Sequence, residues 1–139
     1  KTGTSLINFI SRINNCKGFG FDDWKEYEKD IFIKNILVSQ FDKSINYSNT
    51  TIKNSLFELL KTNVKMDFIF ITNINSINEL YLYLNLALEI INKNGIIAIY
   101  NCNNIKQDIL NDTLNIFIEK NNNLKTVSCD QKINMFMKI

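Results

Sequence analysis

Two adjacent carboxylates, Asp22 and Asp23, are the residues of this sequence best suited to binding chemistry. They follow KGFGF (residues 17–21), a stretch that predicts a short strand, so an acid here would lie at a strand end. A carboxylate in that position can accept charge-assisted hydrogen bonds from two neighbouring hydroxyl groups. Asp22 is the first candidate, and Asp23 replaces it if the register shifts by one residue. A helix cap or a solvated loop acid is the structural alternative.

The same two carboxylates, together with the absence of histidine, argue against several other kinds of site. Asp22 and Asp23 would face opposite ways on a continuing strand, which argues against a hydrolase with paired carboxylates. The sequence has no histidine, so a Ser/His/Asp or Cys/His catalytic site cannot be built. The cysteines, at positions 16, 102 and 129, show no CxxC spacing, and Cys102 has no histidine to activate it. We therefore expect no metal site, and no catalytic residue is identified.

A glycine and a tryptophan offer further contacts to a ligand. Gly3, in KTGTSL, would let the backbone approach a ligand closely, or would simply be flexible. The GFG of residues 18–20 lacks the third glycine of a GxGxxG phosphate loop, so strand and turn packing explains it better. Trp24 could stack on a flat ring, although a lone tryptophan is more often a core or rim anchor.

Polar residues follow two apolar runs, DFIFI (67–71) and GIIAIY (95–100), which predict buried strands. The carboxyl ends of parallel strands form the usual ligand crevice of an open α/β sheet. The side chains expected at this crevice are Thr72, Asn73 and Asn75 after the first run, and Tyr100 and Asn101 at the end of the second. Asparagine is also common in ordinary loops, which is the alternative explanation.

Helical and strand patterns alternate along the chain, which indicates βαβ units and a mostly parallel sheet. The tail is close enough in sequence to form an antiparallel hairpin around Asp130 and Gln131. We expect a three-layer α/β fold in a single domain, residues 1–139. The expected helices cover 5–14, about 27–44, 55–62, 77–92 and 105–120, and the expected strands cover 17–21, 50–53, 67–71, 95–100 and two segments of 124–139.

Composition limits the function classes. The 139 residues are 45% hydrophobic and 22% charged, as in ordinary globular proteins. The net charge of +2 comes from scattered lysines and Arg12, with no basic run that would follow a phosphate backbone. No apolar run approaches the ~18 residues of a membrane span, and no signal peptide is recognisable. We expect a cytoplasmic protein with no membrane association and no strong nucleic-acid signal.

Four segments of the chain resemble, in the family's order, the class I S-adenosylmethionine-dependent methyltransferases, in particular the small group that acts on sugars and other small acceptors. KTGTSL resembles the second half of the glycine motif, and GFGFDDW the second strand with its terminal acid. IKNSLFELL resembles the segment after the third strand, and residues 67–101 the fourth strand, helix and fifth strand. The resemblance implies a Rossmann-like methyltransferase fold with an antiparallel C-terminal hairpin and S-adenosylmethionine as cofactor. The cofactor-binding residues that it implies are Gly3, Asp22, Asp23, Trp24, Asn54, Thr72 and Asn73.

The polar motifs depart from the family more than the apolar framework does. The resemblance places the first strand and the opening glycine before Lys1. Asn54 stands where an aspartate usually contacts the adenine amino group, and Thr72 and Asn73 stand where Asp-Gly is common. Tyr100 and Asn101 replace a frequent pair of acids.

Two functions follow from this combination. The first is methyl transfer to an oxygen of a sugar or other small acceptor, because this reaction needs in-line positioning more than acid–base groups. A base would come from the neighbourhood of Asp22, from Glu79 or from a second chain. The alternative is a catalytically inactive methyltransferase-fold domain that serves as a binding or assembly module with a protein partner or as an oligomer. A receiver-like or flavodoxin-like domain shares the architecture, but an acidic pocket and a switch lysine are not evident.

Overall fold

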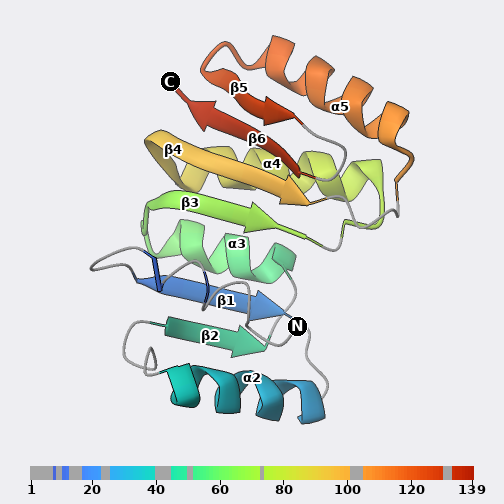
Figure 1. Cartoon of the computed structure of the whole chain (residues 1–139). Helices are drawn as coiled ribbons and strands as arrows, with labels where there is room; N and C mark the ends of the chain where they lie inside the picture. The colour runs from blue at the N-terminus through green and yellow to red at the C-terminus, as the bar shows by residue number, and fades with distance from the viewer. Residues whose placement is uncertain are drawn as a thin grey trace. The chain divides into compact units, whose positions relative to one another are not determined.

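The strands that the structure describes form two sheets, one of two strands and one of four. The structure, a computed structural model, describes residues 8, 11–12, 17–22, 26–39, 45–49, 52–72, 74–100, 105–129 and 133–139 (Figure 1). The chain divides into two compact units, Lys1–Ser55 and Leu56–Ile139, and each holds one of the sheets.

The first unit contains β1 (Gly18–Asp22), α2 (Glu26–Ser39) and β2 (Ile45–Asn49). The two strands pair in parallel, from Gly18 opposite Ile45 to Asp22 opposite Asn49. A parallel pair needs a long crossover connection, and α2 lies within it. Phe32 of α2 is buried, with 2% of its surface exposed. Asp22 is thus the last residue of a strand in a βαβ arrangement.

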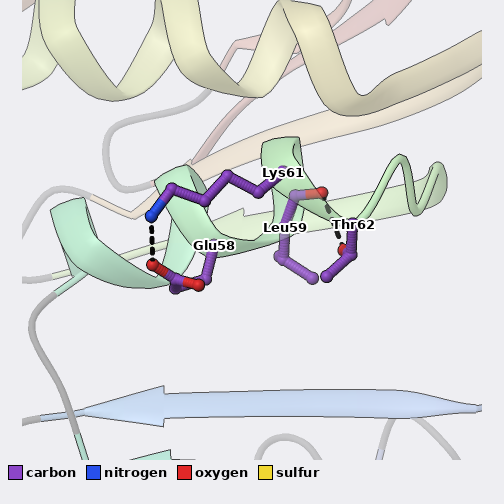
Figure 2. Close-up of polar contacts among 4 residues, drawn as sticks. All are labelled: Glu58, Leu59, Lys61 and Thr62. Atoms are coloured by element: carbon purple, nitrogen blue, oxygen red, sulfur yellow. Dashed lines mark hydrogen bonds and ion pairs between the residues drawn. The ribbon is translucent and has the colours of Figure 1, made fainter.

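Helix α3 (Ile52–Lys61) leads into the second unit, and its end is fixed by local contacts. Lys61 Nζ pairs with Glu58 Oε1 at 2.8 Å, and Thr62 Oγ1 donates to the Leu59 carbonyl at 2.9 Å (Figure 2). Asn63 then takes a left-handed conformation, φ 54°. Asparagine tolerates that conformation better than most residues, so it ends the helix.

The second unit contains a four-stranded mixed sheet in the order β3-β4-β6-β5 (Figure 1). Strand β3 is parallel to β4, whereas β6 is antiparallel to both of its neighbours, β4 and β5. The last two strands therefore form the antiparallel pair expected of the tail. The elements of this unit after α3 are β3 (Met66–Ile71), α4 (Ile77–Ile90), β4 (Ile91–Tyr100), α5 (Gln107–Lys120), β5 (Leu124–Cys129) and β6 (Ile133–Lys138).

The core of the second unit lies between the helices α4 and α5 and one face of this sheet. Ile97 of β4 is opposite Phe136 of β6, and both are buried. The rings of Tyr81 and Phe117 meet edge to face, with centroids 5.8 Å apart, and join α4 to α5. Full burial of an aliphatic side chain contributes about 1.5–3 kcal/mol, so this cluster is the main source of stability in the unit. Its members on α4 and β4 with 0% of their surface exposed are Leu80, Leu84, Ala87, Ile97 and Ile99.

The C-terminal end of α4 carries no cation of its own in the last turn. Lys138 Nζ donates to the carbonyls of Leu88 and Ile91, at 2.9 and 3.2 Å, and Lys65 Nζ donates to the carbonyl of Glu89 at 2.6 Å. Carbonyls at a helix end lack intrahelical partners, and a positive charge there also favours the helix dipole. Lys65 and Lys138, which lie outside α4, therefore cap its C-terminal end.

Several expected elements differ from the structure. The helices expected at about 27–44 and at 55–62 are α2, Glu26–Ser39, and α3, Ile52–Lys61. The strand expected at 50–53 is wrong, because Ile52 and Lys53 open α3, and the strand is β2, Ile45–Asn49. Pairing with β1 selects this segment, although its polar residues gave little strand signal. The helix expected to reach 92 ends at Ile90, because Ile91 is already extended and pairs with Met66. Most of the helix expected at 5–14 lies outside the described residues.

Candidate functional site

The turn between β3 and α4 is the best-described part of the expected ligand edge. Ser76 is the N-cap of α4, and its Oγ accepts a hydrogen bond from the Glu79 N–H at 3.2 Å. Glu79 Oε2 in turn accepts from the Asn75 N–H at 2.9 Å. Ser-x-x-Glu is the sequence of a capping box, here with the return bond displaced by one residue. The turn is thereby held by two side chains from the helix start.

Glu79, one of the candidate bases, therefore also has a structural role as part of the helix cap. Its carboxylate also influences Tyr83, one turn further along α4. Burial and, second, the charge of Glu79 raise the pKa of the Tyr83 phenol. Tyr83 is therefore protonated at neutral pH and can act there as a hydrogen-bond donor but not as a base.

The same edge of the sheet receives the end of β4. Ile71 of β3 is opposite Ile99 of β4, so the next residues, Thr72 and Tyr100, both lie at the carboxyl edge. Both side chains are half-buried. This part of the edge thus offers two hydroxyl groups, and Glu79 belongs to the helix turn that follows it.

Of the other predicted site residues, the structure describes some and not others. Asp22 ends β1, as the sequence indicated, beside Asn49 at the end of β2. Asn54 is in the first turn of α3 rather than directly at a strand end. The remaining predicted cofactor residues, Gly3, Asp23, Trp24 and Asn73, lie outside the described residues, as do Asn101 and Cys102. The cofactor site as a whole therefore stays a prediction.

In the part of the chain that the structure describes, no three His, Cys, Asp or Glu side chains come together as a metal would require. Over the same residues, no helix has both the length and the apolar character needed to cross a membrane.

One feature of the second unit was missed by sequence reasoning. A pocket lies between α5 and the strands β5 and β6, and the buried Asn134 lines it. The residue types of INMFMK do not alternate between apolar and polar, so the sequence alone does not indicate that its asparagine faces inward.

No protein-family model matches this sequence, and no curated protein is similar enough to count as a relative. Solved structures with a similar backbone do exist. A provisionally assigned rRNA methylase from Clostridium thermocellum has a TM-score of 0.75 at 12% identity, over 99% of this chain and 82% of that one. An O-methyltransferase from Bacillus cereus, solved in complex with SAH, has a TM-score of 0.62 at 15% identity, over 96% of this chain and 78% of that one.

A third structure, of a provisionally assigned SAM-dependent methyltransferase from Streptococcus mutans, has a TM-score of 0.72 at 11% identity. It matches 98% of this chain, which spans only 48% of that protein's length. Identities this low show the shared fold alone. The α/β architecture with its mixed sheet is therefore the fold of S-adenosylmethionine-dependent methyltransferases.

Proposed function

We propose that this chain binds S-adenosylmethionine and belongs to a methyltransferase that methylates an oxygen of a sugar or other small acceptor. The observation that carries the proposal is the backbone similarity to an O-methyltransferase solved with SAH, over 96% of this chain. The position of Asp22 at the carboxyl end of β1 supports it, because a carboxylate there can accept hydrogen bonds from both ribose hydroxyls.

The residues of the described edge fit a reaction that depends on positioning. When bound, S-adenosylmethionine supplies an electrophilic methyl group on a positively charged sulfur. Thr72 and Tyr100 can orient an acceptor hydroxyl by hydrogen bonds, and holding it in line with the methyl group provides most of the rate. Glu79, in the first turn of the helix that follows this edge, is a carboxylate that could take the acceptor's proton. Its bond to the Asn75 N–H would hold it in place.

The second candidate is a methyltransferase-fold domain without catalytic activity, which binds a partner or a ligand. The use of Glu79 as a cap favours it, because the described residues of the turn between β3 and α4 then include no carboxylate without a structural role. This candidate predicts cofactor or partner binding without turnover.

RNA is a further acceptor class that we include in the tests. The similarity to the Clostridium thermocellum protein covers 82% of that chain and supports this inclusion. The scattered charge of +2 gives no support to it. Small hydroxylated acceptors therefore stay the first choice.

Calorimetric titration of the protein, in its complete reading frame, with SAH tests the proposal. We expect binding in the micromolar range, and Asp22→Asn should weaken it by about 1–3 kcal/mol, roughly 5- to 150-fold in Kd. Asp30→Asn, an exposed acid on α2, is the matched control and should leave the affinity unchanged.

Affinity weaker than about 1 mM for the unaltered protein would eliminate the enzyme proposal. Equal affinities for the protein and Asp22→Asn would mean that another residue binds the ribose. Tight binding of SAH together with no methylation of sugars, small alcohols or RNA would favour the inactive domain.

A further inference from the structure

The pocket beside α5 lies wholly within the second unit and has a volume of about 140 Å³. Buried residues form its floor. Leu114 and Phe136, each 3% exposed, are apolar, and Asn134, 1% exposed, is polar. Its rim is more polar and includes the exposed Asn115 and Thr126. The described lining residues are Asn111, Leu114, Asn115, Ile118, Thr126, Asn134 and Phe136.

Neighbouring contacts order the walls of this pocket. Gln107 Nε2 donates to Asn111 Oδ1 at 2.9 Å, which orients that amide one turn along α5. On the opposite wall, Thr126 is paired with Phe136 directly before an irregularity in the β5–β6 register. Such bulges re-aim side chains and recur beside binding sites.

Asn134 occupies a position where an aliphatic residue would be expected. It is opposite Ile99, which is fully buried, and it shares the inward face of β6 with Phe136. Its Nδ2 is buried and donates no hydrogen bond in the structure, although other atoms of the residue do interact. A buried donor without an acceptor is costly, whereas an aliphatic side chain would avoid the cost. The amide torsion of asparagine is soft, so this donor can adjust to an acceptor in the pocket that Asn134 lines.

We propose that the pocket binds an uncharged, ring-sized molecule that carries a hydrogen-bond acceptor for Asn134. None of the described lining residues is charged, so a charged ligand would be desolvated without a partner. The volume is close to that of the roughly 150 Å³ apolar cavity that accommodates benzene. Leu114, Ile118 and Phe136 offer the apolar wall for a ring, and the Asn134 amide offers the donor.

This site is independent of the proposed methyl transfer. It uses neither Asp22 nor Thr72 and Tyr100, so the two proposals can fail separately. Loss of SAH binding by Asp22→Asn would leave the pocket unaffected.

Amide chemical-shift titrations of the protein with pyridine and benzene, at a pH where pyridine is uncharged, test the pocket. The two rings have nearly the same size, but only pyridine carries an acceptor. We expect both to shift the amides of Leu114 and Thr126, with pyridine about tenfold tighter, the value of one buried hydrogen bond. Asn134→Leu should remove this preference and leave benzene binding intact.

Asn85→Leu, on the exposed side of α4, is the matched control and should preserve the preference for pyridine. If Asn134→Leu does not fold, Ile118→Phe provides the second test, because a larger side chain at the rim should block both rings. Equal affinities for pyridine and benzene in the unaltered protein would overturn the role of Asn134. The absence of shifts with either ring would mean that the pocket holds water only, and would overturn the proposal.

Discussion

Gly95 of β4, directly before Ile96, where pairing with β3 resumes after an irregularity, occupies a position with no room for a side chain. A Cβ atom there would lie 2.7 Å from Ile91 Cγ1 and 3.0 Å from the Asn92 carbonyl oxygen. Ile91 is itself 1% exposed and cannot move away without disturbing the core. Asn94, directly before, is left-handed with φ 65°.

Gly95→Ala should therefore destabilise the protein by about 1–3 kcal/mol, the usual cost of an overpacked position. Urea unfolding followed by circular dichroism measures this loss. Lys93→Ala, an exposed neighbour, should change the stability by less than about 0.5 kcal/mol. If the two variants were equally stable, the close approach of Ile91 to Gly95 would not exist in solution.

At the scale of elements, α4 matters most because its first turn forms part of the candidate site. Ser76→Ala removes the acceptor of the Glu79 N–H and should cost about 1 kcal/mol. Thermal or urea unfolding would register it. Ser76→Asn should restore most of the loss, because asparagine caps as well as serine. Asn78→Ala, an exposed change in the same turn, should be neutral or slightly stabilising. A loss for Asn78→Ala equal to that for Ser76→Ala would show that the cap is not the cause.

The elements that could be predicted from sequence are those whose apolar pattern is strong and local. Helix α4 carries Leu80, Leu84 and Ala87 on one face, and the core of β4 is the apolar run GIIAIY. Strand β2 could not be found in this way, because INYSN becomes a strand through pairing with β1, a contact distant in sequence. Strand pairing also decides where an element ends. The helix expected to reach residue 92 ends before Ile91, because Ile91 pairs with Met66 of β3.

The candidate site was predictable only in outline. The positions of Asp22, Thr72 and Tyr100 at strand ends follow from strand boundaries, which the sequence indicates. The engagement of Glu79 by the Asn75 N–H depends on the exact turn between β3 and α4, which no periodicity encodes. The pocket at Asn134 forms between α5 and a hairpin, so it required their packing and could not be read from either segment alone.

For the whole molecule, the property to predict is the number of cooperative units that the 139 residues form. The sequence favoured a single domain, whereas the chain divides into the compact units Lys1–Ser55 and Leu56–Ile139. A single cooperative domain unfolds in one transition, and a ligand that binds only the native state stabilises it by mass action.

Scanning calorimetry with and without SAH therefore tests the single-domain prediction together with cofactor binding. We expect one transition whose calorimetric and van't Hoff enthalpies agree, because a chain of this length normally unfolds as one unit. SAH at a hundred times its Kd should add about 2.7 kcal/mol and raise the midpoint by several degrees. Asp22→Asn, at the same SAH concentration, should show a smaller rise, and Asp30→Asn the full one. Two separate transitions, of which SAH moves only one, would instead establish two domains and assign the cofactor to one of them.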